Sequence, residues 1–434
     1  MGFATPGAGE ERRHLYGSYP MKRKILLTVL VSAVLTIAKI GFQRSQAGMH
    51  LQAITYVELQ SYLMRSFPAE NLPIVVLDIS DLAPVGSPDK PHVPRNQLQK
   101  IVETLESLDV KPRSIGIDVD FSPENGHWIT AEDPGLFAKC VSYAPDVPVF
   151  LGVGRSIPMG RKGWLGSERF QELAAALSIP LDGRTMFASI KAGNEDELES
   201  ISSKLASRLP VSKPSLPAWS LERFQESSFK ALDYKSFLID YSPLETLTRE
   251  RVNVTDPKTI VDEKDHFAGK AVLIGRATYG KTTDMFAVPG KSGNLGVPGV
   301  LIHAAAVYSL ADPLYEFRPA AEFLLDVGLI AIGLAVVSIS SWWYSRRNEE
   351  VNEERLELIC CFISALLIIV LGIAIRMTRV MWDGFALSAF VIVMHPFLPR
   401  IANSSWKTLT GGWRRVALKE APRTTRTKRK AKEA

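Results

Sequence analysis

Residues 270–310 read KAVLIGRATYGKTTDMFAVPGKSGNLGVPGVLIHAAAVYSL, and the pattern of this stretch predicts a strand, a loop and a helix in direct succession. Its first six residues, 270–275, are almost continuously apolar, which is typical of a strand buried on both faces of a parallel sheet. Apolar residues recur at helical spacing in its last part and in the residue that follows, so we expect a helix at residues 298–311. A buried strand followed by a helix indicates an α/β layered domain.

Four more short apolar runs resemble that strand, at residues 74–79 (IVVLDI), 114–121 (SIGIDVDF), 147–153 and 236–241 (SFLIDY). Helical patterns at residues 94–108 and 134–143 lie between them. We therefore predict a mostly parallel sheet with helices on both faces. Residues 155–230 are rich in serine, leucine and charge, and we interpret them as an inserted, mostly helical segment.

Four apolar segments approach the length of about 20 residues that a helix needs to cross a bilayer. They lie at residues 25–42, 320–344, 356–375 and 382–398. We therefore predict four transmembrane helices, with one large domain at residues 46–318 between the first and the second.

Basic residues indicate the orientation of these spans, because positively charged loops stay in the cytoplasm. Five basic residues lie in the N-terminal segment 1–24, and eleven lie in the tail 400–434. Both termini are thus expected in the cytoplasm, with the large domain on the outer side of the membrane. Arg376 and Arg379 are an exception, since they fall in a short outer loop.

A cleaved signal peptide is the alternative interpretation of the first span. Basic residues 22–24, an apolar stretch and Ser45-Gln46-Ala47 before Gly48 fit the three-part pattern of such a peptide. Cleavage would remove one anchor and leave the domain on the same side of the membrane.

The composition limits which disulfides, metal sites and partners the chain can have. Of the three cysteines only Cys140 lies in the large domain, so an internal disulfide is excluded there. The seven histidines are scattered singly, and we predict neither a metal site nor a cofactor. The basic tail follows an apolar span, which favours binding to anionic lipids of the inner leaflet over nucleic acid.

The stretches IVVLDISD from Ile74, VPRNQLQKIVETL from Val93 and SIGIDVDFSPE from Ser114, together with residues 270–310, resemble the CHASE type 2 (CHASE2) family. These are extracytoplasmic sensor domains associated with cyclases and histidine kinases, and three spans usually follow them. The resemblance covers most of residues 50–400 and implies an outer sensor domain. This chain departs from the family pattern at residues 91–95 and at Leu301, which affects pocket chemistry and not the fold.

Residues 275–282, GRATYGKT, match the phosphate-loop pattern, with Gly275, Gly280, Lys281 and Thr282 at the positions that define it. Such a loop needs a helix that begins at its Lys-Thr, so that backbone amides face the phosphates. The following residues include Pro289 and Gly290, which disfavour a helix, and ATP is scarce outside the cell. We interpret the loop as a tight connection after a strand, with nucleotide binding as the alternative.

Acidic residues gather at or near the predicted strand ends, where ligands bind in an open parallel sheet. The ligand-binding candidates are Asp78, Asp81, Asp118, Asp120 and Asp240, together with Asp284 in the predicted loop between the strand at 270–275 and the helix at 298–311. Asp118 and Asp120 are expected on one face, because side chains alternate along a strand. The alternative role for all of these acids is to cap helices and bind loop amides.

Arg95, at the expected start of a helix, is a candidate for pairing with a strand-end carboxylate such as Asp118 or for binding an anionic ligand. His303 is expected to be a packed helix residue. The sequence contains no nucleophile elbow and no zinc pattern, so we do not expect an enzyme.

The inner loop and the tail are too short for a kinase or cyclase domain, which CHASE2 proteins usually carry. We therefore predict a sensor for a small molecule or peptide that signals through its spans to a separate membrane or cytoplasmic effector, with a homo-oligomer possible. The alternative is an assembly subunit of an envelope complex, which a pocket lined only by apolar residues would favour. The third hypothesis is an outer hydrolase or nucleotide-binding protein that uses residues 275–282.

Overall fold

A computed structural model describes residues 21–45, 47–48, 51–52, 55, 70, 72–87, 90–123, 130–154, 163–177, 187–192, 198–214, 216–223, 236–282, 284–288, 296–347, 353–382 and 384–398. The chain forms two compact units. The membrane unit comprises Met1–Gly41, Arg318–Met377 and Trp382–Ala434, and the soluble unit comprises Phe42–Phe317 and Thr378–Met381.

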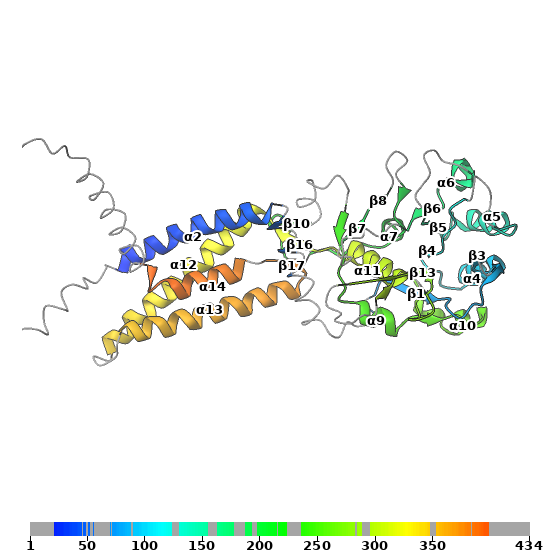
Figure 1. The fold of residues 1–434 in the computed structure, drawn as a ribbon. Coiled ribbons are helices and arrows are strands. Elements are labelled where there is room, and N and C mark those ends of the chain that lie inside the picture. Colours follow the sequence, from blue (N-terminus) through cyan, green and yellow to red (C-terminus); the bar gives the residue numbers. More distant parts are fainter. Residues whose placement is uncertain are drawn as a thin grey trace, which may run out of the picture. The chain divides into compact units, whose positions relative to one another are not determined.

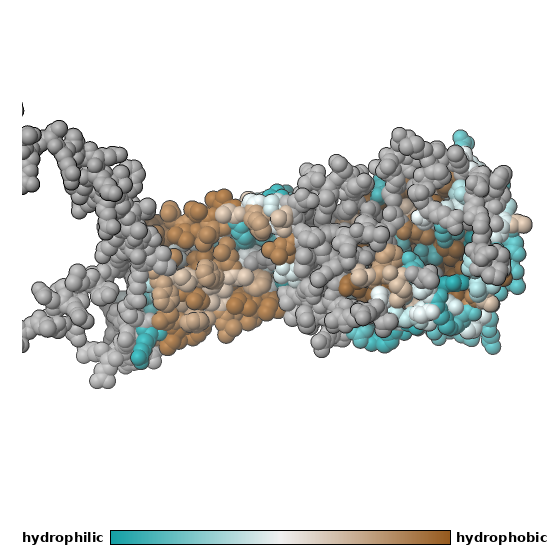
Figure 2. Space-filling model, viewed as in Figure 1, coloured by the Kyte–Doolittle hydropathy of each residue, from teal (hydrophilic) through white to brown (hydrophobic). Residues whose placement is uncertain are grey.

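The described part of the membrane unit is a bundle of helices α2 (Met21–Gln43), α12 (Pro319–Arg347), α13 (Glu353–Met377) and α14 (Gly384–Met394) (Figure 1). Among the described residues, three segments are long and apolar enough to cross a membrane: Ile25–Gln43, Pro319–Ser340 and Arg355–Arg376. Figure 2 shows a largely hydrophobic surface over these helices. The chain is therefore a membrane protein.

Helix α14 corresponds to the fourth predicted span, residues 382–398, but is shorter. It has 11 residues and is almost wholly apolar. A helix of that length extends about 16 Å, about half of the hydrocarbon core of a bilayer. The fourth crossing, and with it the cytoplasmic placement of both termini, stays a prediction.

Polar side chains join helices within the bundle. Lys39 on α2 binds the carboxylates of Glu322 and Asp326 on α12, each at 2.6 Å. The indole of Trp382 donates to Asp326 at 2.8 Å. Because unpaired charges are costly in a membrane, such pairs hold specific helices together.

The soluble unit is built on a six-stranded sheet in the order β12-β1-β13-β4-β5-β6, and every neighbouring pair is parallel. The strands are β1 (Ile74–Asp78), β4 (Ser114–Ile117), β5 (Val149–Val153), β6 (Ala174–Ala176), β12 (Val252–Asn253) and β13 (Ala271–Gly275). The predicted mostly parallel sheet is confirmed.

Helices cover both faces of this sheet, because its strands are apolar on both sides. One face packs against α4 (Arg95–Glu106), α5 (Asp133–Tyr143) and α10 (Pro257–Asp262), and the other against α7 (Ile201–Ala206), α9 (Leu244–Arg249) and α11 (Gly299–Ala311). Within β1, Val75 and Leu77 belong to the first core, whereas Ile74 and Val76 belong to the second. This alternation is the period of an extended strand.

Short elements complete the soluble unit. Four two-stranded ladders pair β2 (Val85–Ser87) with β3 (Lys90–His92), β7 (Phe187–Ser189) with β11 (Ser236–Leu238), β8 (Lys191–Ala192) with β9 (Leu198–Glu199), and β14 (Met285–Phe286) with β15 (Val297–Pro298). The short helices are η2 (Gly163–Gly166), α6 (Glu168–Gln171) and η3 (Lys264–His266).

A separate three-stranded sheet, which we name the junction sheet, connects the soluble unit to the chain of the membrane helices. It consists of β10 (Leu221–Arg223), β16 (Tyr315–Phe317) and β17 (Val380–Met381) in the order β10-β16-β17. Strand β16 directly precedes α12, and β17 is the connection between α13 and α14.

Two predicted features differ from the structure. The strand predicted at residues 236–241 pairs antiparallel with β7 outside the main sheet, because it lies beside a segment that apolar runs alone do not reveal. The described residues of the segment 155–230 are not mostly helical: they contain β6, which completes the main sheet, and β7 to β10. These strands have two or three residues each, too few to show a period.

Candidate functional site

The carboxyl ends of β1, β13 and β4 form the candidate site. The helices that follow β1 and β4 pack on one face of the sheet, whereas α11, the helix that follows β13, packs on the other. Chains that leave neighbouring strands in opposite directions open a crevice at the strand ends, where ligands bind in α/β sheets. The predicted acidic candidates Asp78, Asp118 and Asp120 lie here.

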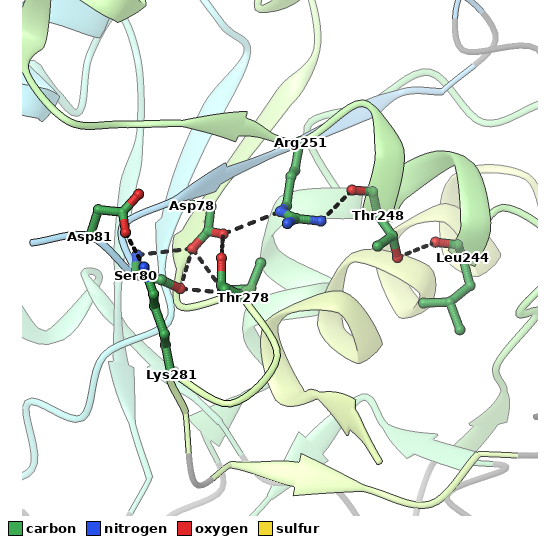
Figure 3. Close-up of polar contacts among 9 residues, drawn as sticks. Asp78, Ser80, Asp81, Leu244, Thr248, Arg251, Thr278 and Lys281 are labelled. Carbon is green, nitrogen blue, oxygen red and sulfur yellow. Dashed lines mark hydrogen bonds and ion pairs between the residues drawn. The ribbon is translucent and has the colours of Figure 1, made fainter. Parts of the chain in front are cut away.

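Asp78, the last residue of β1, is held by a dense set of hydrogen bonds (Figure 3). Its Oδ1 accepts from the amides of Ser80 and Ala277, both at 2.9 Å. Its Oδ2 accepts from the hydroxyl of Thr278 at 2.7 Å and from Nε of Arg251 at 3.2 Å. This carboxylate therefore ties together the ends of β1, β12 and β13.

The pKa of Asp78 follows from these bonds. Burial alone would raise the pKa, but hydrogen bonds from Ser80, Thr278 and Ala277 outweigh it and hold the pKa below its ordinary value. With Asp78 only 2% exposed, its geometry matches the structural alternative, in which a strand-end acid binds loop amides.

The loop after β13 carries the phosphate-loop string, but its lysine is engaged elsewhere. Lys281 binds the carboxylate of Asp81, as Figure 3 shows. Gly280 has a φ of +79°, a conformation that favours glycine in a turn. The described residues between Gly280 and β14 form no helix, so the positive helix end that phosphate binding needs is missing from them.

Asp118, Asp284 and His303 form a second group at the N-terminal end of α11. Two glycines make room for the acids: a Cβ at Gly275 would lie 3.1 Å from that of Asp118, and a Cβ at Gly299 would lie 2.1 Å from Oδ2 of Asp284. Asp284 is exposed, Asp118 is half-buried and His303 is 4% exposed. The group therefore runs from the surface into the core.

The protonation states in this group are perturbed. Loss of water around its carboxyl group raises the pKa of Asp118 to about 7, and partial loss of water together with the nearby Asp118 carboxylate raises the pKa of Asp284. Burial lowers the pKa of His303 to about 4, although Asp284 acts in the opposite direction. Two acids that resist ionisation beside a neutral imidazole can bind a cationic group or exchange a proton near neutral pH.

His303 also packs as the sequence indicated. Its Nδ1 lies 3.3 Å from the hydroxyl of Ser202 on α7, and that hydroxyl donates to the backbone carbonyl of His303 at 3.2 Å. The sequence alone does not place His303 with the acids, since it lies 19 positions after Asp284 in the chain. The i, i+4 spacing from Gly299 along α11 is the signal that could have found it.

Arg95 is buried and pairs with an acid other than Asp118. Its Nε donates to Asp133 of α5 at 2.9 Å, and its guanidinium lies 4.1 Å from the ring centre of Phe121. Burial lowers the pKa of Arg95, and Asp133 acts in the opposite direction. Arg95 thus joins α4 to α5.

Asp120 binds the amides of another pair of strand ends. Its Oδ1 accepts from the amides of Ser122 at 2.9 Å and Gly154 at 3.0 Å, which connects the ends of β4 and β5. The regular alternation that would place Asp118 and Asp120 on one face ends with β4 at Ile117. The two carboxylates consequently have different surroundings.

Asp240, the remaining strand-end candidate, binds a residue that sequence reasoning treated only as an exception to the charge rule. Its carboxylate lies 2.8 Å from Arg379 of the α13–α14 connection, and Asp240 is 1% exposed. The sequence did carry a signal for this pair. Arg379 is an exception to the charge rule in the predicted topology, and a basic residue in such a place is expected to be neutralised by an acid from elsewhere in the chain.

A cavity of about 410 Å³ lies at the opposite, amino end of the strands. Its walls combine apolar with charged side chains: Glu70, Leu72, Ile74, Val75, Val76, Leu247, Glu250, Asp265, His266 and Lys270. Its volume is within the range of small-molecule pockets. Across the described residues, no group of three or more His, Cys, Asp or Glu side chains is arranged to hold a metal ion.

Comparison with known proteins gives one match. The searches of curated proteins and of solved structures find none. A scan against family models matches the CHASE2 domain over residues 28–339, which is more than half of the chain and includes the whole main sheet, both groups of acids and α11. The chain belongs to the CHASE2 family of extracytoplasmic sensory domains.

Proposed function

We propose that this protein is a membrane-anchored sensor whose α/β domain binds a small-molecule or peptide ligand outside the cytoplasm. Its membrane helices would pass the resulting change to a separate membrane or cytoplasmic partner. The observation that carries the proposal is the CHASE2 match over a domain that lies, in sequence, between apolar helices. The protein would act by binding and not as an enzyme.

The Asp118 group is the site that we propose for the ligand. It lies at the sheet edge where α/β domains bind ligands, and Asp284 makes it accessible to solvent. Unlike Asp78, Asp118 has no side-chain hydrogen bond within the described chain. A protonated amine or another cationic group on the ligand would offset the cost of ionising Asp118 and Asp284 there.

The cavity at the amino end of the strands favours sensing over the alternative role as an assembly subunit. A purely structural subunit would be expected to line such a cavity with apolar side chains alone. Glu250, Lys270 and Asp265 instead place both signs of charge on its walls. Charged groups that converge on an apolar pocket are typical of sites that select a ligand.

The proposed placement follows the charge pattern of the chain. The soluble unit would lie in the periplasm, with both termini in the cytoplasm and the basic tail against anionic lipids of the inner membrane. Nucleic acid is not among the proposed partners, and self-association is compatible with the proposal.

A thermal-shift screen of the full-length protein in detergent tests ligand binding. A ligand at 100 times its Kd should stabilise the folded protein by about 2.7 kcal/mol. The shift should vanish in Asp118→Asn and persist in Asp81→Asn, which changes an exposed acid on a neighbouring loop. If amines, amino acids and short peptides leave the melting temperature unchanged, ligand sensing at this site is contradicted.

Crosslinking in intact membranes tests the signalling partner. A specific membrane or cytoplasmic protein should be captured by the full-length chain, and the yield should change with the ligand found in the screen. A crosslinking yield that stays the same with and without ligand would contradict signalling and favour an assembly role.

A further inference from the structure

Arg379 lies in the connection between α13 and α14, and its side chain binds the C-terminal end of α11. Its Nη1 donates to the hydroxyl of Tyr308 at 2.6 Å, and its Nε lies 3.0 Å from the carboxylate of Asp312. Its Nη2 donates to the backbone carbonyl of Asp312. The guanidinium thus caps the C-terminal end of α11, where a cation is favoured by the helix dipole.

The contacts of Arg379 are buried and charged. Besides Asp312 it pairs with Asp240 at 2.8 Å, and its guanidinium lies 4.8 Å from the ring centre of Tyr308. The side chains of Arg379 and Asp240 are 13% and 1% exposed. Burial raises the pKa of Tyr308, although Arg379 acts in the opposite direction, so its hydroxyl stays neutral. Breaking such a pair on one side leaves a buried charge without a partner.

The backbone of Arg379 is strained to make these contacts. Its φ is +63°, and among the described residues it alone has a positive φ without being glycine. That conformation costs a residue with a side chain about 1–2 kcal/mol, so glycine or asparagine would be the ordinary choice for this turn. The contacts of Arg379, which we name the Arg379 clamp, offset this strain, and its backbone carbonyl also accepts from the amide of Tyr315 of β16 at 3.0 Å.

Helix α11 connects the clamp to the proposed ligand site. It begins at Gly299 beside Asp284 and ends beside Arg379, and its 13 residues extend about 20 Å. Twelve of those residues are buried, against the sheet, α7 and α9. A close-packed helix cannot bend freely, so a displacement at one end moves the other.

We propose that α11 is the transmitting element of this sensor and that Arg379 is the clamp through which it acts on the α13–α14 connection. This inference rests on the proposed sensory function. Ligand bound at the Asp118 group would shift α11, and the contacts of Arg379 with the end of α11 would shift or break. Strand β17 would then pass the movement to α13 and α14, the helices on either side of it in the chain. The junction sheet is the output of the domain.

Hydrogen–deuterium exchange of the full-length protein in lipid nanodiscs tests the coupling without a ligand. In Arg379→Ala, exchange should become faster at residues 378–381 and also, by about 5-fold or more, at residues 299–303 at the far end of α11. Because coupling between two sites is reciprocal, Gly299→Ala should in turn alter exchange in β16 and β17. Arg44→Ala is the control, since Arg44 forms an exposed pair with Glu222 of the same junction sheet.

The outcomes separate the possibilities. Remote changes from Arg379→Ala and Gly299→Ala, with none from Arg44→Ala, support the clamp. Changes confined to residues 308–312 and 378–381, or an equal remote change in the control, overturn it. If Arg379→Ala does not fold, the neutral pair Arg379→Gln with Asp240→Asn decides by the same criterion. A failed ligand screen would contradict the sensory function while leaving this coupling intact, so the two failures are distinguishable.

Discussion

Asp78 and Asp81 lie three residues apart, yet their carboxylates should contribute very differently to stability. Asp78 is buried and accepts bonds from Arg251, Thr278 and two backbone amides, whereas Asp81 makes one exposed pair with Lys281. We expect Asp78→Asn to lower the free energy of unfolding by about 3 kcal/mol, because it removes the buried negative charge and leaves one acceptor oxygen for donors that now bind two.

The matched control is Asp81→Asn, which should change the free energy of unfolding by less than about 1 kcal/mol, as exposed ion pairs usually do. Chemical denaturation of the full-length protein in detergent, followed by tryptophan fluorescence, measures both. Equal effects of the two substitutions would show that the Asp78 network does not stabilise the sheet edge.

The titration of Asp118 and His303 should give the soluble unit two opposing dependences on pH. The pKa of Asp118 is raised from 3.8 to about 7, so between those values the folded state holds a proton that the unfolded state has lost. Stability therefore falls as pH rises through this window. The pKa of His303 is lowered from 6.5 to about 4, so there the unfolded state binds more protons and stability rises with pH.

Replacing either Asp118 or His303 should reveal the pH dependence of stability that the other residue causes. In Asp118→Asn, stability should rise as the pH is raised from about 4 to 6.5. In His303→Gln, stability should fall as the pH is raised from about 4 to 7, and the raised pKa of Asp284 adds to this fall. His266→Gln, at an exposed histidine, should retain the shallow profile of the parent protein. Unfolding curves across this range measure the slopes, and parallel profiles for all three variants would refute the assignment.

The sequence could indicate which residues lie at the sheet edge but not what they bind. Strand-end position is a local property, so Asp78 and Asp118 are placed correctly by the apolar runs before them. Their partners are distant in the chain: Arg251 lies 173 residues from Asp78, and Arg379 reaches Asp240 from a loop between membrane helices. Only the folded chain brings these groups together.

At the scale of elements, the N-terminal end of α11 depends on a glycine. A Cβ at Gly299 would lie 2.1 Å from Oδ2 of Asp284 and 3.2 Å from the ring of Phe286. Gly299→Ala should therefore displace Asp284 and weaken ligand binding at the Asp118 group, despite the helix propensity of alanine. Ligand titration and thermal unfolding of the full-length protein measure the two effects.

Gly135 in α5 is the matched glycine for this test. A Cβ there would meet its nearest neighbour, Gln99, at 3.8 Å, an ordinary contact. Gly135→Ala should leave ligand binding unchanged and stabilise the protein by about 0.5–1 kcal/mol, because alanine loses less backbone entropy in a helix. Equal losses of ligand affinity in both variants would mean that α11 has no special role.

Long elements were predictable because a period needs length to appear. The expected helices at residues 94–108, 134–143 and 298–311 correspond to α4, α5 and α11, and the expected strands of the sheet include β1, β4, β5 and β13. The edge strands β12 and β6 have two and three residues, and β6 is all alanine, which favours a helix by intrinsic propensity. Pairing with a strand already in place decides their conformation.

At the scale of the whole molecule, buried charge pairs occur in both units. In the predicted orientation Arg379 is an exception to the rule that places positive charge in the cytoplasm, and Asp240 and Asp312 in the soluble unit neutralise it. Within the membrane unit, Lys39 serves the same purpose for Glu322 and Asp326. Both arrangements connect segments that are more than 60 residues apart in the chain, so each holds the topology as well as the local structure.

From the pair at Lys39 we predict that α2 stays in the bundle and is not removed as a signal peptide. Asp326 is fully buried, and Lys39 is the cation that it binds. Lys39→Met should therefore lower the thermal stability of the detergent-solubilised protein markedly, and adding Asp326→Asn should recover part of the loss, because it removes the unpaired charge. The intact mass of the protein isolated from membranes should be that of a chain that still contains residues 25–43. A mature chain that begins after Ala47 would make α2 a signal peptide, and the two variants would then unfold like the parent protein.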